Sequence, residues 1–240
     1  MIRPAVIWAP VALLLLVSGV AQAGPGEDPR AWLEQMSTAM NQLSYQGTFV
    51  YMQGDNVETV RITHVSDEDG VRERMVSLSG EPSEVLRDSN GVRWVQGDGL
   101  SVLEDSAFNR SFFPRMSEGQ SDSASQSYSL KFGKDARIAG HPARNVKVLP
   151  RDVYRYGYSL WLEKHSGLLL KWELVDSDRN PLAKLVFTDN KMGSQVDPGE
   201  LKPGKRKDEY KTVASDLPVG QVGATKAPRW QPSRLPPGFQ

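Results

Sequence analysis

The chain has 240 residues, of which 39% are hydrophobic and 24% charged, a composition typical of a folded globular protein. It contains no cysteine, which excludes disulfide bridges, thiolate metal sites and cysteine nucleophiles. Basic and acidic side chains number 29 each, so no overall field attracts the chain to nucleic acid or to an anionic membrane.

The N-terminus predicts a secretory signal peptide over residues 1–23. Arg3 supplies the positive charge before an apolar run, and Ala21-Gln22-Ala23 provides the small residues of a signal peptidase site. The alternative is a membrane anchor, but Pro10 interrupts a run already short for the ~20 apolar residues of a membrane span. With no cysteine after the cleavage site there is no position for lipid attachment. We therefore expect a soluble protein in the periplasm.

One helix is predicted at the start of the mature chain, from Asp28 to Ser44. Asp28 suits the N-cap, and Pro29 suits the first helical position, where its missing N–H is not needed. One face is apolar and carries Trp32, Met36, Ala39, Met40 and Leu43. The opposite face is polar and carries Glu34, Gln35, Thr38, Asn41 and Gln42. We expect the helix to lie on an apolar surface with its polar face in water.

After the helix the apolar pattern changes to the two-residue period of strands. Strand-like runs cover residues 47–53, 57–65, 71–78, 84–88, 92–96, 100–104, 128–132, 143–150, 156–164, 168–176 and 181–188. Asn90-Gly91 and Asp98-Gly99 are typical of tight hairpins, so these runs predict an antiparallel meander. Leu168-Leu169-Leu170 is apolar on both faces, which indicates a strand covered on both sides. The sheet is therefore expected to curve around the helix.

Three segments depart from this pattern. Residues 109–126 pass from Phe112-Phe113-Pro114 into a polar stretch, which predicts a mobile flap whose part 119–126 is cut first by proteases. Residues 24–204 would form the large domain. Residues 205–229 are charged and glycine-containing, as expected of a linker. Residues 230–240 would begin a further domain.

No recognised catalytic motif is present, so the sequence predicts a protein that is not an enzyme and needs no cofactor. His64, His141 and His165 lie on separate elements without metal-ligand spacing. The acidic run Asp67-Glu68-Asp69-Gly70 lacks the distal glutamate of a calcium loop, and we interpret it as a solvated turn.

Two features point to binding. A curved sheet holding one helix leaves room for an apolar ligand, and the candidate lining residues are Trp32, Met36, Met40, Phe49, Tyr51, Trp94, Tyr158 and Leu160. Arg72 and Arg74 share one strand face and are candidates for contacting a phosphate or carboxylate head group. The alternative is that these arginines protect an exposed edge strand from aggregation.

Several motifs together resemble one known family. They are Ser44-Tyr45-x-Gly47-x-Phe49-Val50-Tyr51, Arg61-Ile62-x-His64, Glu84-Val85-x-Arg87, and Arg155-Tyr156-Gly157-Tyr158-x-Leu160-Trp161-Leu162 followed by Ser166-Gly167-Leu168-Leu169-Leu170-Lys171. This set resembles the RseB/MucB family of periplasmic regulators of an envelope-stress sigma factor. Leu235-Pro236-Pro237-Gly238-Phe239 is similar to the opening of that family's smaller C-terminal domain, so we expect a truncated sequence.

The resemblance implies a mainly β (α+β) fold, an antiparallel incomplete β-barrel wrapped on an N-terminal helix, similar to the carriers LolA and LolB. It also implies binding to the periplasmic part of an RseA/MucA-type anti-sigma factor, which is thereby shielded from a DegS-type protease. Lipid or lipopolysaccharide fragments would release that partner. The alternative function is a soluble periplasmic carrier of lipid or lipoprotein that uses the same cavity.

Overall fold

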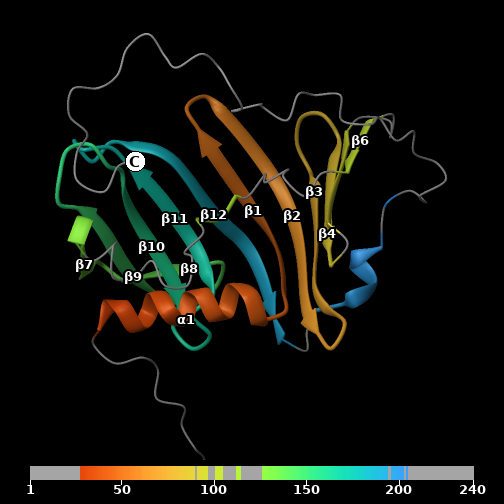
Figure 1. Cartoon of the computed structure of the whole chain (residues 1–240), viewed down its shortest axis with the longest axis horizontal. Helices are drawn as coiled ribbons and strands as arrows, with labels where there is room; N and C mark the ends of the chain where they lie inside the picture. Colours follow the sequence, from red (N-terminus) through yellow and green to blue (C-terminus); the bar gives the residue numbers. More distant parts are fainter. Residues whose placement is uncertain are drawn as a thin grey trace, which may run out of the picture.

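The computed structural model describes residues 28–89, 91–96, 101–104, 112–114, 126–193, 196–202 and 204. One α-helix, α1 (Pro29–Gln42), precedes a 12-stranded sheet (Figure 1). The first strands are β1 (Tyr45–Gln53), β2 (Asn56–Asp67), β3 (Gly70–Ser77), β4 (Ser83–Asp88), β5 (Gly91–Gln96) and β6 (Ser101–Glu104). The later strands are β7 (Tyr128–Phe132), β8 (Ala136–Ile138), β9 (His141–Pro150), β10 (Gly157–Glu163), β11 (Leu169–Val175) and β12 (Pro181–Met192), followed by the 3-10 helix η2 (Pro198–Leu201).

Helix α1 begins where the sequence predicts and ends at Gln42, with Leu43 as its C-cap, slightly before the predicted Ser44. The Asp28 carboxylate accepts a hydrogen bond of 2.9 Å from the backbone N–H of Arg30, and Pro29 occupies the first turn. At the other end, the N–H of Leu43 donates to the carbonyl of Ala39 over 3.0 Å. The residues buried along the helix are Trp32, Leu33, Met36 and Ala39. The predicted apolar face is therefore confirmed, and Leu33 widens it.

The strands form one open antiparallel sheet in the order β6-β5-β4-β3-β2-β1-β12-β11-β10-β9-β7. Each half is a meander, and the antiparallel pairing of β1 with β12 joins the two halves. The two edge strands of this sheet, β6 and β7, do not pair with each other, so the sheet is not closed (Figure 1). This confirms the predicted incomplete barrel on an N-terminal helix. The short strand β8, which pairs with β9, was not predicted because three residues are too few for a periodic signal.

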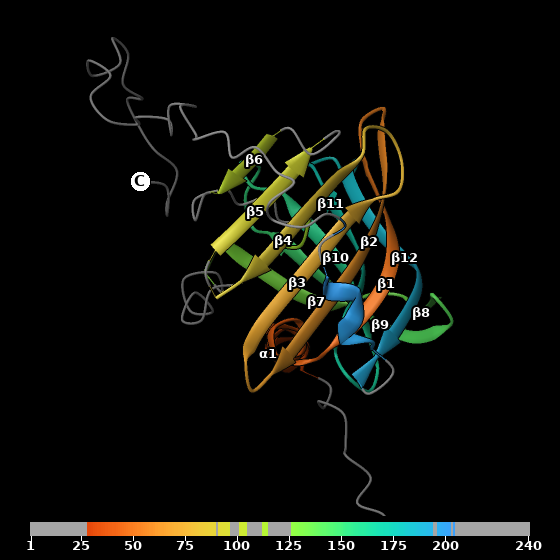
Figure 2. The same ribbon diagram turned by 90° about the vertical axis from the view of Figure 1, so that its right-hand side faces the viewer.

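The helix lies across the inner face of the curved sheet, where Figure 2 shows it end-on. One buried cluster combines helix residues with residues from both halves of the sheet. Leu168, Leu169 and Leu170 are all buried, as their uniformly apolar character predicts. Gln35 departs from the expected polar face, because its side-chain amide donates to the carbonyl of His165 over 3.1 Å. The helix is thus held to the β10–β11 turn by a polar contact as well as by apolar packing.

Glu163 organises that same turn. Its carboxylate accepts hydrogen bonds from the backbone N–H groups of His165 and Ser166, at 2.9 and 2.7 Å, and from the Ser166 hydroxyl at 2.9 Å. The side chain is buried, and these three donors compensate its desolvation. A short-range polar motif therefore fixes the hairpin that carries the buried leucines.

Position 47 requires glycine because β1 lies very close to its neighbour β12 there. A Cβ atom at this position would lie 2.4 Å from the carbonyl oxygen of Asp189 and 3.0 Å from the ring of Phe187. The β1–β12 register also shifts between Thr48 and Phe49. Any side chain at position 47 would push apart the two strands that join the halves of the sheet, which explains the glycine in this motif.

No helix among the described residues is long and apolar enough to cross a membrane. The predicted signal peptide (1–23), linker (205–229) and further domain (230–240) lie outside the described residues, and so do residues 115–125 of the predicted flap. These predictions stay as they were made from the sequence.

Candidate functional site

The register of β2 to β5 separates an inner from an outer face. Ile62 lies opposite Met75, Met75 opposite Val85, and Val85 opposite Trp94, so these four side chains form one row. Ile62, Met75 and Val85 belong to the buried cluster beneath the helix, which identifies the row as inward-facing. Side chains one residue along each strand point to the outer face.

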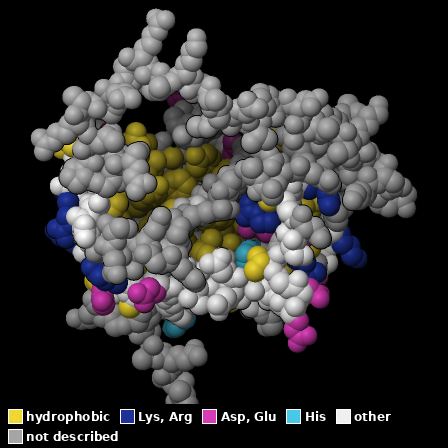
Figure 3. Space-filling view, in the orientation of Figure 1, with side chains coloured by type: hydrophobic (Ala, Val, Ile, Leu, Met, Phe, Trp, Pro, Cys, Tyr) yellow, Lys and Arg dark blue, Asp and Glu magenta, His cyan; other side chains and the backbone are white. Residues whose placement is uncertain are grey.

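All eight predicted ligand-lining residues belong to this inner surface. Trp32, Met36, Phe49 and Leu160 are buried members of the cluster, whereas Met40, Tyr51, Trp94 and Tyr158 are half-buried and pack against it. Figure 3 shows the surface as a hollow of hydrophobic side chains open on one side of the molecule. The four half-buried residues keep side-chain surface that a ligand could contact, whereas the four buried ones belong to the core beneath them. Their role as ligand contacts remains a prediction.

Phe112 and Phe113 already cover part of that surface. The Phe112 ring lies 5.3 Å from both the Phe49 and Tyr51 rings, and the Phe113 ring lies 5.7 Å from Phe49. The Trp172 indole N–H donates to the Phe112 carbonyl over 2.9 Å. The prediction of a mobile flap over residues 109–126 is therefore wrong for Phe112, which packs into the core through aromatic contacts.

The two predicted head-group arginines lie on the outer face. Arg74 lies opposite Thr63 and Leu86, one residue out of step with the inward row. It forms an ion pair with Glu84, and its Nη1 donates to the Glu200 carbonyl over 2.9 Å. Figure 2 shows η2 on this outer side of β2 and β3, opposite α1. The C-terminal end of the described chain therefore covers Arg74.

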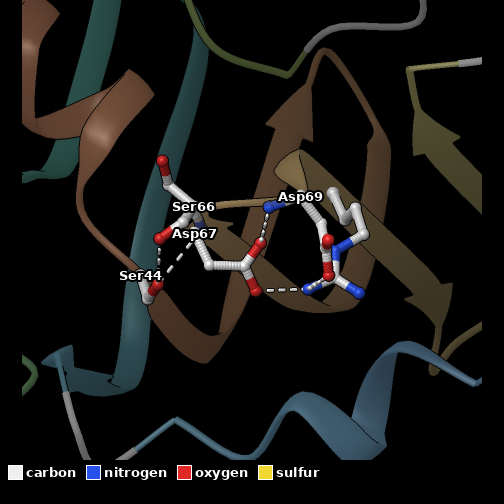
Figure 4. A network of polar contacts seen from close by, with 5 residues as sticks. Ser44, Ser66, Asp67 and Asp69 are labelled. Atoms are coloured by element: carbon white, nitrogen blue, oxygen red, sulfur yellow. Dashed lines mark hydrogen bonds and ion pairs between the residues drawn. The ribbon is translucent and has the colours of Figure 1, made fainter.

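Arg72 is also held by a carboxylate on the outer face, where it pairs with Asp67. Figure 4 shows the surrounding β2–β3 turn, in which the Asp69 N–H donates to Asp67 over 3.1 Å. In the same view the Ser66 N–H donates to the Ser44 hydroxyl over 3.1 Å. The carboxylates of the acidic run thus stabilise a turn, as expected from the missing calcium ligands.

The edge-strand explanation for Arg72 and Arg74 is wrong, because β3 pairs with β2 on one side and β4 on the other. Both arginines form ion pairs on the outer face of an interior strand, and their role as head-group contacts stays a prediction. The two-residue period of the strand correctly predicts that Arg72 and Arg74 share one face. It does not show whether that face is the inner or the outer one.

A polar row on the inner face was not predicted. Tyr45, His64, Glu73 and Arg87 lie opposite one another across β1, β2, β3 and β4. Glu73 bridges its neighbours: its Oε2 lies 3.4 Å from His64 Nδ1, and its Oε1 lies 3.3 Å from Arg87 Nη1. The His64 ring stacks on the Tyr45 ring with centroids 4.7 Å apart. The strand pairings, which sequence alone did not specify, are what bring these residues together.

The three histidines remain separate. His141 Nε2 lies 3.4 Å from the Asn190 carbonyl, and His165 belongs to the β10–β11 turn, far along the chain from His64. Within the part of the chain that the structure describes, no three His, Asp or Glu side chains are grouped as metal ligands would be.

Tyr45 makes the folded state sensitive to alkaline pH. Burial, and secondarily the Glu73 carboxylate, raise the pKa of its hydroxyl well above the ordinary value, whereas Arg87 opposes the shift. The unfolded chain loses this proton near pH 10 and the folded chain keeps it, so stability falls as pH rises above about 10. We expect Tyr45→Phe to reduce that loss, measured as the urea midpoint between pH 9 and 11. An unchanged pH dependence in the variant would contradict this assignment to Tyr45.

A family model described as the MucB/RseB N-terminal domain matches residues 28–205. The sigma factor AlgU regulatory protein MucB of Pseudomonas aeruginosa is 33% identical over 230 residues, covering 94% of this chain and 69% of the relative. The sigma-E factor regulatory protein RseB of Escherichia coli is 25% identical, covering 97% of this chain and 72% of the relative.

The chain is also similar to solved structures of MucB. The crystal structure of MucB in complex with MucA(peri) has 31% identity and a TM-score of 0.62, covering 78% of this chain and 62% of that chain. The complex structure of Pseudomonas aeruginosa MucA/MucB has 32% identity and a TM-score of 0.63, covering 78% of this chain and 63% of that chain. An uncharacterized conserved protein from Thermus thermophilus shares the fold alone, with 13% identity and a TM-score of 0.52.

Proposed function

Because the chain belongs to the MucB/RseB family, we propose that it regulates an envelope-stress sigma factor by binding the periplasmic part of a MucA/RseA-type anti-sigma factor. The observation that carries this proposal is the solved complex of the related MucB with MucA(peri). The predicted signal peptide supports a periplasmic location, where such a partner would expose its segment. The protein would act by binding alone: it would cover the partner and so shield it from proteolysis, without catalysing a reaction.

A lipid-sensing role is the second part of the proposal. The half-buried side chains Tyr51, Trp94 and Tyr158 support this role, because an acyl chain would pack against their apolar surface. Burial of an acyl chain gains about 0.8 kcal/mol per methylene, or roughly 10 kcal/mol for a dozen methylenes before the entropic costs of binding. Lipid would release the partner only if the two prefer different states of the protein.

The carrier alternative uses the same hollow. A soluble carrier would bind lipid equally well, but it would not recognise the anti-sigma segment. Binding to that segment therefore distinguishes the two functions, whereas lipid binding alone supports both.

The experiment is a competition. The periplasmic segment of the anti-sigma factor from the same genome is immobilised, the protein is bound, and lysophospholipid or lipopolysaccharide is titrated. We expect binding to the segment, protection of the segment from a DegS-type protease, and release at saturating lipid. A periplasmic segment of an unrelated membrane protein serves as control.

Each outcome bears on a different part of the proposal. Lipid binding without binding to the segment would support the carrier instead of the regulator. A complex that survives saturating lipid would leave the shield and remove lipid sensing.

A further inference from the structure

We propose that Arg87, held in place by Glu73 and His64, contacts the anionic head group of an amphiphile whose chain occupies the hydrophobic hollow. This inference deepens the lipid-binding part of the proposed function and rests on it. The ligand class is a single-chain or multi-chain lipid with a phosphate or carboxylate head group.

Arg87 lies on the same face as the hollow. Along β4 it is two residues from Val85, which belongs to the buried inner cluster, so both side chains point inward. On the neighbouring strand it lies opposite Val92, two residues from the inward-facing Trp94. The register therefore places Arg87 next to apolar residues on β4 and β5 along the inner face. Figure 3 shows basic side-chain atoms beside the hydrophobic hollow.

Exposure increases along the polar row towards Arg87. The His64 and Glu73 side chains are 5% and 10% exposed, whereas the Arg87 side chain is 25% exposed. Glu73 is thus a buried anchor and Arg87 is the member of the row that a ligand can reach. A guanidinium group carries five N–H donors in a planar fork. Among the described residues, its ion pair is with Glu73 through Nη1, which leaves further donors for an anion.

The polar row is poorly explained as a stabilising element. His64 Nε2 is buried and has no hydrogen-bond partner among the described residues. An unpaired buried polar atom destabilises a fold, and an ion pair surrounded by apolar side chains is no more stabilising than apolar residues of similar volume. Stability alone therefore does not account for this row, and the accessible guanidinium group at its end offers a binding role.

Arg72 and Arg74, the candidates that the sequence suggested, are less suited to this contact. Both lie on the outer face, away from the hollow, and Arg74 is covered by the segment that contains Glu200. An amphiphile with its chain in the hollow would have to reach through the sheet to contact them. Arg87 needs no such path.

The test compares two probes that share one alkyl chain, dodecyl phosphate and dodecyl maltoside, each kept below its micelle concentration. Binding is measured by calorimetry for the wild type, Arg87→Gln and the matched variant Arg74→Gln, which also removes an arginine paired with a glutamate. We expect Arg87→Gln to weaken dodecyl phosphate binding about tenfold or more, because a charge-assisted hydrogen bond is lost. Dodecyl maltoside binding should be unchanged, and Arg74→Gln should bind both probes as the wild type does.

Two further variants separate contact from positioning. Arg87→Lys keeps the charge and should retain part of the preference for dodecyl phosphate, which also covers the case in which Arg87→Gln fails to fold. Glu73→Gln loosens the guanidinium group but also removes a negative charge that repels the anion. These effects oppose each other, so dodecyl phosphate binding should change by less than in Arg87→Gln.

Three results would overturn the inference. The first is an Arg87→Gln variant that binds dodecyl phosphate as tightly as the wild type. The second is an equal loss of both probes, which would make Arg87 a structural residue only. The third is a selective loss in Arg74→Gln, which would move the head group to the outer face. A wild-type protein that binds neither probe would instead contradict lipid binding itself, and with it the basis of this inference.

Discussion

Trp32→Ala is expected to lower the free energy of unfolding by about 3–5 kcal/mol, the cost typical of truncating a fully packed tryptophan. Trp32 is only 6% exposed and belongs to the cluster shared by the helix and both halves of the sheet. Its removal leaves a cavity that the surrounding close-packed core fills only in part. The measurement is the urea midpoint at constant m-value, followed by far-UV circular dichroism.

Glu34→Ala is the matched control for that prediction. Glu34 is exposed on the same helix, so its loss should change stability by no more than about 0.5 kcal/mol. If Trp32→Ala proved as mild as the control, the helix could not be packed on the inner face of the sheet in solution.

Phe112→Ala combined with Phe113→Ala is expected to increase the affinity for a lysophospholipid roughly tenfold, which corresponds to 1.4 kcal/mol. The two rings cover Phe49 and Tyr51 on the surface that the acyl chain would occupy. A ligand that binds there must displace them, so its apparent affinity is reduced by the fraction of molecules in which the surface is free. Calorimetric titration of the double variant against the wild type measures the change.

Tyr154→Ala is the control for this experiment, because Tyr154 is an exposed aromatic residue that does not pack against the inner cluster. It should leave the lysophospholipid affinity unchanged. A weaker affinity of the double variant would show that the two phenylalanines form part of the wall that holds the ligand. An unchanged affinity would place the ligand elsewhere.

Family membership was predictable because its evidence lies in short motifs that can be recognised without knowledge of the fold. The structure adds the physical reason for two of them. Gly47 allows β1 to approach β12 closely, and Ser166 participates in the turn that Glu163 organises. Both are local requirements of one strand crossing and one hairpin, so they leave a recognisable pattern in the sequence.

The sequence by itself determined most of the secondary structure, without β8 and η2, and the class of the sheet. The Asp28 cap, the helical spacing of Trp32 and Met36, and the two-residue period after Gly47 are interactions between residues near in the chain. Short turns join successive strands, so an antiparallel meander follows from the spacing of the turns. The same reasoning placed eight apolar residues on the inner surface, because large apolar side chains along one curved sheet pack into the same interior.

Only the tertiary structure decided which face of each strand is inward and what meets across it. Arg74 and Arg87 are both arginines on neighbouring strands, yet the register places one under η2 and the other beside the hollow. Phe112 was assigned to a flap because its neighbours in the chain are polar, but it packs on Phe49 and Tyr51 from a distant strand. The alternation of residues along a strand shows which side chains share a face, but it does not show whether that face points inward or outward. That choice depends on long-range pairings, above all β1 with β12, which bring the two halves of the chain around one core.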